Sequence, residues 1–272
     1  MTTVGAALAA ARTKLPASEA RRLLGHVLAR PTAWLIAHDD EILGEDALLA
    51  FASLVARRAG GEPAAYLVGR REFFGREFEV SPAVLIPRPE TELLVELGIA
   101  KVGADSAATI LDLGTGSGCI AITLALEMPL ARVTAVDASE PALRVARDNA
   151  EKHVASLRLL QSDWFGALSG ERFDLIVANP PYIADADPHL AAGDLRHEPQ
   201  SALSSGADGL EAIRRIVADA PEHLNAGGQL LLEHGYDQAA TVRELLEAAG
   251  LFGIEQHRDL AGIARVSGGR IR

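Results

Sequence analysis

The chain has 272 residues, of which 49% are hydrophobic, enough to form one large domain or two modest ones. Its formal net charge is −11, and the excess acidity lies entirely in residues 81–272, because residues 1–80 carry ten basic and ten acidic side chains. No apolar run approaches the roughly 18 residues of a membrane span. The acidity argues against a protein that holds duplex nucleic acid by its phosphates and suits a cationic small molecule.

Cysteine and histidine usage narrows the class of protein further. The single cysteine, Cys119, excludes an internal disulfide and suits a reducing compartment, so we expect a cytoplasmic location. The alanine-rich start has no charged segment before it, so we predict no signal peptide. The eight histidines are scattered, and no cysteine and histidine cluster has the spacing of metal ligands. We therefore expect neither a membrane anchor nor a bound metal.

The first part of the chain predicts a small helical domain. Residues 18–30 place four apolar side chains on one helical face, with Ser18 as the expected N-cap. Residues 46–59 repeat the helical pattern. Alternating residues around a glycine then predict a hairpin linker over about residues 70–82. We assign a helical domain to residues 1–75.

Residues 83–272 alternate between strand and helix patterns. The expected strands are residues 109–113, 132–136, 157–160, 174–178, 229–233, 254–258 and 264–270. Such alternation predicts an α/β fold, in which helices cover both faces of a doubly wound, mostly parallel, seven-stranded sheet of the Rossmann-like kind. In an open sheet of this type, ligands bind beyond the carboxyl ends of the strands.

A glycine-rich loop follows the first of these strands. It consists of Gly114, Thr115, Gly116, Ser117 and Gly118. Glycines let the backbone approach a ligand closely and adopt positive φ. The dinucleotide fingerprint requires another glycine three residues after the second one, and Cys119 occupies that position. The pattern therefore disfavours a dehydrogenase and leaves a cofactor of another kind.

The next two strands also end in polar or aromatic residues. Asp137 ends one strand, where a carboxylate is placed to accept hydrogen bonds from ribose hydroxyls. Asp163 ends the following strand and is a candidate acceptor for an adenine amino group, with Trp164 as a candidate surface for the adenine. The alternatives are that Asp137 caps the next helix and that Trp164 belongs to the core.

The most specific stretch follows the fourth strand and reads Asn179, Pro180, Pro181 and Tyr182. Each proline fixes its own φ and pushes the residue before it into an extended conformation. A planar NH₂ group offers two donors and needs two acceptors, which the Asn179 side-chain oxygen and a proline-flanked carbonyl can supply. The stretch indicates a clamp for an amide or amino group, and the alternative is a rigid exit from the strand.

Four successive strand ends thus carry features that a core does not need, and here the chain resembles class I S-adenosylmethionine-dependent methyltransferases. It resembles one family more closely, the release-factor glutamine methyltransferases. The shared stretches are REFFGREFEV at 71–80, VLIPRPETELLVE at 84–96, LDLGTGSG at 111–118, AVDAS at 135–139, SDWF at 162–165, FDLIVANPPYI at 173–183, HEPQSAL at 197–203 and the closing GGRIR. The resemblance covers nearly the whole chain. One departure is His234, which stands where an aliphatic residue is usual and leaves the local packing open.

The resemblance implies a methyltransferase domain over 83–272, a substrate-recognition role for 1–75 and S-adenosylmethionine as cofactor. It implies methyl transfer to the glutamine side-chain amide nitrogen in the Gly-Gly-Gln motif of class I peptide chain release factors. By resemblance, Asn179 is the catalytic residue and the Pro180 carbonyl is the second acceptor, with Pro181 and Tyr182 at the glutamine slot. The implied cofactor residues are Gly114, Thr115, Gly116, Ser117, Gly118, Asp137, Asp163, Trp164 and Asn179. No direct nucleic-acid, membrane or metal partner is expected.

Two other hypotheses remain. An amino-group methyltransferase acting on adenine or guanine would use the same clamp on a flipped base. It would also need a basic groove and an added recognition domain, and the sequence indicates neither. A non-catalytic nucleotide-binding module would not need Asn179.

Overall fold

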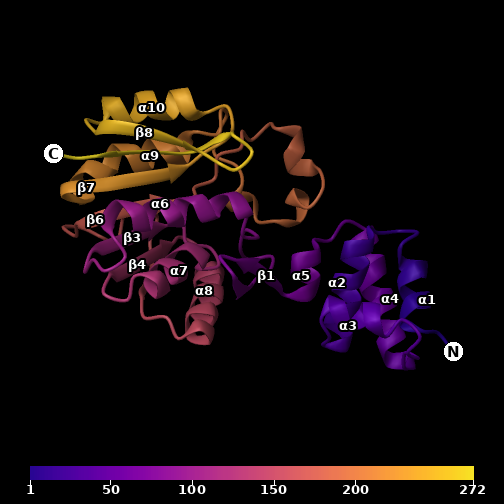
Figure 1. Ribbon diagram of the computed structural model, residues 1–272. Helices are drawn as coiled ribbons and strands as arrows, with labels where there is room; N and C mark the ends of the chain where they lie inside the picture. Colours follow the sequence, from indigo (N-terminus) through magenta and orange to yellow (C-terminus); the bar gives the residue numbers. More distant parts are fainter. The chain divides into compact units, whose positions relative to one another are not determined.

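A computed structural model describes all 272 residues, and they divide into two compact units, Met1–Arg70 and Arg71–Arg272. No helix is long and apolar enough to cross a membrane. The first unit is helical throughout (Figure 1) and contains α1 (Val4–Ala11), α2 (Ala17–Leu28), α3 (Thr32–Ala37), α4 (Glu45–Ala59) and α5 (Ala64–Val68). Its core is formed mainly by the buried apolar faces of α1, α2 and α4, with Leu35 of α3 completing it.

Two helix details of this unit differ from the sequence prediction. The Ser18 N-cap is wrong, because Pro16 precedes the first turn of α2 and no side chain caps it. The short helices α1 and α5 were not predicted. Both are rich in alanine, which packs well against neighbours but gives no contrast between an apolar and a polar face.

The second unit begins with the predicted hairpin, β1 (Arg70–Phe73) and β2 (Arg76–Glu79). A 3₁₀ turn, η1 (Pro89–Thr91), leads into α6. The helices are α6 (Glu92–Val102), α7 (Cys119–Glu127), α8 (Glu140–His153), α9 (Glu211–Asp219) and α10 (Ala239–Ala248). The strands of the large sheet are β3 (Thr109–Leu113), β4 (Arg132–Asp137), β5 (Arg158–Gln161), β6 (Phe173–Ala178), β7 (Leu224–Glu233), β8 (Phe252–Arg258) and β9 (Ala264–Arg270).

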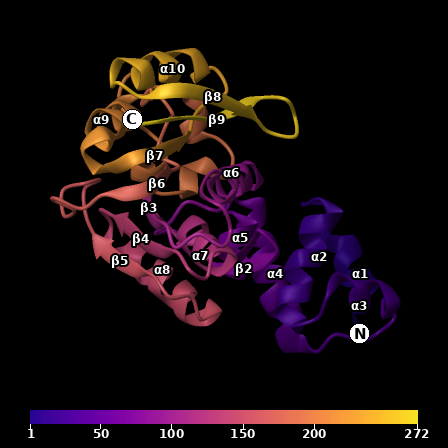
Figure 2. The ribbon, with the colours of Figure 1, turned by 60° about the vertical axis from the view of Figure 1, so that its left-hand side comes forward.

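The large sheet has the predicted seven strands in the order β5-β4-β3-β6-β7-β9-β8. Figure 2 shows β5, β4, β3, β6 and β7 in this succession, from the lower to the upper part of the view. All pairs from β5 to β7 are parallel, and β9 pairs antiparallel with both β7 and β8. The chain crosses from β5 back to the other side of β3, so the sheet has a switch point between β3 and β6.

Two apolar layers cover the faces of the sheet, which confirms the doubly wound prediction. On one face, Leu94 of α6 and Ile120 and Leu124 of α7 pack over the strands together with the hairpin phenylalanines. On the other face, Ile213 and Ile216 of α9 pack with Val242 and Leu246 of α10. Residues of β3 alternate between these layers, as expected for a strand buried on both sides. The carboxyl edge of the parallel strands is not covered by these layers and is available to form a site.

Candidate active site

An open cleft with an empty volume of about 1000 Å³ lies at the carboxyl edge of the sheet. Its walls come from four strand ends and two loops. The predicted residues that line it are Gly114, Thr115, Gly116, Ser117, Asp137, Asp163, Trp164, Asn179 and Pro181. Tertiary structure thus gathers at one place residues that are up to 67 positions apart.

The glycine loop connects β3 to α7, and each of its three glycines has positive φ. A Cβ on Gly114 would lie 3.4 Å from the Trp164 ring, so the absence of a side chain lets that ring pack over the loop. A Cβ on Gly116 would meet no protein atom within 4 Å. Gly118 does not line the cleft, since it precedes α7 and a Cβ there would lie 2.8 Å from Ile122 Cδ1 and 3.2 Å from Ala146 Cβ.

Asp137 at the end of β4 fastens the glycine loop. Its Oδ2 accepts from the Gly116 N–H at 2.9 Å, and its Oδ1 accepts from the Ser139 N–H at 2.9 Å. Burial raises the pKa of this carboxyl, and these two backbone N–H groups offset part of the rise. The alternative role as helix cap belongs to Ser139, which precedes α8 and accepts from the Ala142 N–H at 3.3 Å. Asp137 is therefore available at the cleft wall as an acceptor.

Asp163 and Trp164 follow β5 and lie at the far end of the cleft. Asp163 is exposed and pairs through Oδ2 with Arg215 at 2.7 Å. Trp164 has positive φ, and its carbonyl accepts from Ser162 Oγ at 2.7 Å, which fixes this tight turn. Its ring is half-buried, lining the cleft with one part and packing on the core with another. The core alternative and the cofactor-contact prediction are thus both compatible with its position.

Asn179 stands next to the glycine loop, because β3 and β6 are paired with Leu113 beside Ala178. Its Nδ2 donates to Thr91 Oγ1 at 3.1 Å. Thr91 lies in η1 and is 2% exposed, so a buried hydroxyl anchors the amide nitrogen. With the nitrogen anchored, the side-chain oxygen is the free polar atom that Asn179 brings to the cleft.

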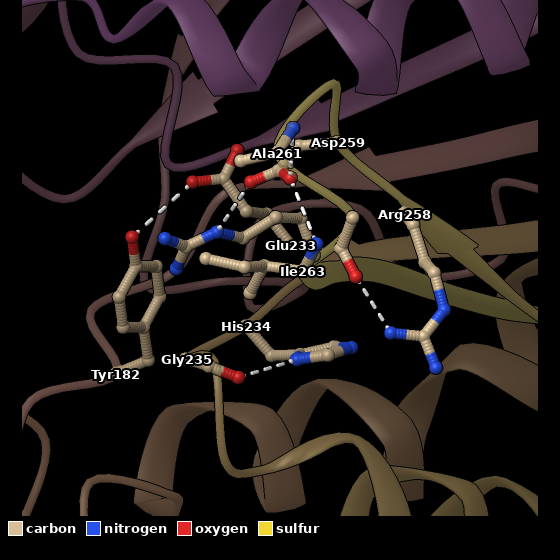
Figure 3. A network of polar contacts seen from close by, with 10 residues as sticks. Tyr182, Glu233, His234, Gly235, Arg258, Asp259, Ala261 and Ile263 are labelled. Carbon is tan, nitrogen blue, oxygen red and sulfur yellow. Dashed lines mark hydrogen bonds and ion pairs between the residues drawn. The ribbon is translucent and has the colours of Figure 1, made fainter.

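Pro180 is buried and does not line the cleft, and neither does Tyr182. The Tyr182 hydroxyl instead donates to Glu233 Oε1 at 3.3 Å, which Figure 3 shows. Burial and the nearby Glu233 carboxylate raise the pKa of the tyrosine, so it is a neutral donor. Glu233 is 1% exposed, and burial raises its pKa to about 7. A titratable group that no sequence pattern indicated therefore lies behind the clamp.

His234 is fully buried directly after Glu233. Its Nδ1 lies 2.8 Å from the Gly235 carbonyl (Figure 3), and its Nε2 lies 2.8 Å from Ser267 Oγ. A carbonyl only accepts, so Nδ1 carries the proton and Nε2 accepts from the serine. Burial lowers the pKa of the imidazole. The unusual histidine is thus accommodated as a neutral residue with both nitrogens hydrogen-bonded.

Two loops form the wall opposite the strand ends, and Glu198 joins them. Its side chain is fully buried, and its Oε1 accepts from Arg88 Nη2 at 2.5 Å. Its Oε2 accepts from the Ile86 N–H at 2.9 Å. Arg88 lines the cleft from one loop, and Pro199 lines it from the other. A buried carboxylate with two donors, one from each of Ile86 and Arg88, holds these loops together. No spacing rule would have found the pair of Arg88 and Glu198, which are 110 residues apart.

Another buried carboxyl supports the glycine loop from below. Asp112 in β3 is fully buried, and its Oδ2 accepts from Thr115 Oγ1 at 2.6 Å. Its Oδ1 has no hydrogen-bond partner. Burial raises the pKa of Asp112 to about 7, against the lowering effect of the threonine hydroxyl. Sequence reasoning missed this residue because it lies inside an apolar strand, although a charged side chain in such a run was the available signal.

The fold of the second unit is also found in solved methyltransferases. The 16S rRNA N2 G1207 methyltransferase of Thermus thermophilus, solved with AdoMet and guanosine, matches with a TM-score of 0.57 at 23% identity. The match covers 75% of this chain and 50% of that one. Residues 90–208 match the family model described as Methyltransferase small domain. Fold and cleft therefore define an S-adenosylmethionine-dependent methyltransferase.

Closer relatives identify the family. Residues 2–69 match the model described as PrmC N-terminal domain. The chain is 54% identical to the release factor glutamine methyltransferase of Burkholderia pseudomallei, over 94% of this chain and 93% of that one. It is 52% identical to the enzyme of the same name from Bordetella pertussis, over 94% and 95%. The chain belongs to the release factor glutamine methyltransferase family.

Proposed function

We propose that this protein transfers a methyl group from S-adenosylmethionine to the glutamine side-chain amide nitrogen in the Gly-Gly-Gln motif of class I peptide chain release factors. One observation supports the proposal most. Asn179 lies at the cleft wall beside the glycine loop, and Thr91 holds its nitrogen. The side-chain oxygen is thereby left as an acceptor where a target NH₂ group would enter.

The cleft residues fit the cofactor. Gly116 leaves open space where any other residue would place a Cβ, and Asp137 offers carboxylate lone pairs for ribose hydroxyls. Gly114 and Thr115 lie between these groups and Asn179, so they are placed to border the methionine part. Trp164 supplies a flat apolar surface for the adenine. When bound, S-adenosylmethionine supplies a methyl group activated by its positively charged sulfur.

The protein's task is to make an amide nitrogen reactive. That nitrogen is a poor nucleophile, because its lone pair is delocalised into the carbonyl. Acceptors on both N–H bonds draw electron density toward the nitrogen and orient its lone pair. We assign one acceptor to the Asn179 side chain and, by resemblance to the family, the other to the backbone carbonyl of Pro180, a residue that is buried next to the cleft lining. Correct placement supplies much of the rate, and fixed acceptors that meet the developing positive charge supply another part.

We also propose that the helical unit, Met1–Arg70, recognises the protein substrate. It has its own apolar core and contributes no residue to the cleft lining. It matches a family-specific model, whereas the fold of the second unit is shared with a methyltransferase of ribosomal RNA. A unit that is characteristic of the family but contributes nothing to the cleft is suited to recognising a folded protein substrate.

A direct test compares three acceptors with labelled S-adenosylmethionine and the full chain. The acceptors are a class I release factor, its variant in which the motif glutamine is replaced by alanine, and bulk nucleic acid. We expect label in the first alone, at the glutamine by peptide mass analysis. Label in nucleic acid, or equal labelling of the alanine variant, would overturn the assignment in favour of an amino-group methyltransferase or another target residue.

A further inference from the structure

We propose that Glu233 is a positioning residue that sets the direction of the Asn179 amide through the hydroxyl of Thr91. The inference rests on the proposed function, in which the Asn179 oxygen receives the target amide. It adds a reason why the oxygen, rather than the nitrogen, faces the cleft. An Asn side chain has an acceptor end and a donor end of nearly the same shape, so shape alone does not select between them.

The three residues come from separate elements that meet behind the cleft. In the sheet, Ala178 of β6 is paired with Leu232 of β7, so the next residues, Asn179 and Glu233, leave adjacent strands side by side. Thr91 in η1 accepts from Asn179 Nδ2 at 3.1 Å. Thr91 and Glu233 are 2% and 1% exposed, so water does not compete for their hydrogen bonds.

Glu233 needs donors. Its Oε1 accepts from Tyr182, whereas its Oε2 is buried without a hydrogen-bond partner of standard geometry. Thr91 is a buried hydroxyl bonded to Asn179, which leaves the strand next to that of Glu233. The Thr91 and Tyr182 hydroxyls both lower the pKa of the carboxyl. A hydroxyl hydrogen rotates to the best acceptor available. Thr91 is therefore the source of the second donor.

The protonation state of Glu233 then determines which group donates and which accepts at Thr91, and through Thr91 at Asn179. An ionised carboxylate only accepts, so Thr91 directs its single hydrogen toward Glu233. The Thr91 oxygen is left to accept, and Asn179 meets it with Nδ2, as observed. The Asn179 oxygen faces the cleft as a consequence. A protonated Glu233 can instead donate to Thr91, which frees the threonine hydrogen for the Asn179 oxygen. The amide would then present its NH₂ group to the target NH₂ group, donor against donor.

The charged groups around Glu233 leave it able to change protonation state. Arg265 of β9 favours the carboxylate, and Glu90 of η1 disfavours it. Arg265 is itself paired with Asp259 at 3.2 Å, so its charge is shared. Desolvation outweighs all of these and raises the pKa of Glu233 to about 7. The carboxylate form that directs the relay therefore predominates above about pH 7 and is lost below it.

The first experiment removes and restores the hydroxyl. Thr91→Val keeps the shape without the hydroxyl, and Thr91→Ser keeps the hydroxyl. We expect single-turnover methylation of a release factor to fall about tenfold in Thr91→Val, the upper end for one neutral hydrogen bond, and to recover in Thr91→Ser. Thr123→Val is the matched control, since Thr123 is a fully buried threonine in α7 whose hydroxyl donates to the Cys119 carbonyl at 2.6 Å and does not line the cleft. It should react like the parent protein.

The second experiment uses pH. At saturating cofactor and substrate, we expect the parent rate to rise with pH through about 7 and Glu233→Gln to lose this rise. Infrared spectra of the free protein provide a readout independent of activity: the protonated-carboxyl absorption that titrates near pH 7 should lose the Glu233 contribution in Glu233→Gln and keep that of Asp112.

The outcomes separate this inference from the proposed function. If the parent protein does not methylate the release factor, the proposed function fails. If the parent is active but folded Thr91→Val is equally active, or if the pH rise persists in Glu233→Gln, the relay is wrong and the function stands. Thermal melting confirms that each variant folds. If Glu233→Gln does not fold, the comparison of Thr91→Val with Thr91→Ser tests the relay.

Discussion

The carboxylate of Asp137 holds the backbone of Gly116, whose N–H donates to Asp137 Oδ2 at 2.9 Å across the mouth of the sheet. Asp137 is the last residue of β4, and Gly116 lies in the loop after β3, the neighbouring strand. A single carboxyl therefore shapes the glycine loop and borders the same cleft. Substitutions at this contact should weaken cofactor binding more than they slow methyl transfer.

We expect Asp137→Ala to weaken S-adenosylmethionine binding by about 1.5–3 kcal/mol, the usual contribution of hydrogen bonds to a charged group. The rate at saturating cofactor should remain within a few-fold, because Asn179 is untouched. Titration calorimetry measures the affinity, and Asp163→Ala at the exposed end of the cleft is the comparison. Unchanged affinity in Asp137→Ala would remove this residue from the cofactor site.

Asn179→Ala removes an acceptor that is needed most as the nitrogen attacks. Loss of one such partner typically costs about 2.7–4 kcal/mol, or roughly 10²–10³ in turnover. Asn179→Asp keeps an acceptor but loses the NH₂ donor to Thr91, so some activity should survive that is absent in alanine. Single-turnover methylation with saturating release factor is the measurement, and cofactor affinity should stay within a few-fold. Near-normal turnover in Asn179→Ala would eliminate the clamp from the mechanism.

Gly116→Ala and Gly118→Ala form a matched pair, since both residues have positive φ and both substitutions should cost about 1–3 kcal/mol in backbone strain. At Gly116 the new methyl would meet no protein atom and would project into open space beside the cleft. At Gly118 it would press on Ile122 and Ala146. We expect the first to lose cofactor affinity beyond its loss of stability, and the second to lose mainly stability. Denaturant unfolding and calorimetry separate the two, and the reverse pattern would contradict the assignment.

The buried carboxyl of Asp112 makes stability depend on pH. Its folded-state pKa is raised from 3.8 to about 7, so the folded protein retains this proton where the unfolded chain has lost it. The contribution is therefore complete below about pH 4 and decreases as pH rises to about 7, by an amount on the order of 4 kcal/mol. Asp112→Asn should remove this decrease. Urea unfolding between pH 4 and 8 measures it, and an unchanged slope in Asp112→Asn would show that the carboxyl titrates normally.

Removal of the helical unit tests its proposed role. The second unit contains the complete cleft lining and both apolar layers of the sheet, so residues 71–272 should fold and bind S-adenosylmethionine as the full chain does. Methylation of a folded release factor should nevertheless collapse. Methylation of a short peptide that contains the Gly-Gly-Gln motif should decrease far less. Full activity of the truncated chain on the intact release factor would refute the recognition role.

The sequence by itself determined the parts of this protein that depend on local pattern. Alternating strand and helix patterns imply a parallel sheet, and parallel strands bring their carboxyl ends to one edge. For that reason Gly116, Asp137, Trp164 and Asn179 were recognisable as neighbours before any coordinates. The two prolines after Asn179 likewise act on the backbone next to them, so their effect is visible in the sequence.

Only the tertiary structure decided what supports those residues. Thr91 lies 88 positions before Asn179, and Glu198 lies 110 positions after Arg88, so no spacing links the partners. Burial decided the chemistry of Glu233, because the largest cause of its raised pKa is the removal of water from the carboxyl by the surrounding fold. The sequence pattern places Asn179 at a strand end, and the packing of distant elements determines which way its side-chain amide points.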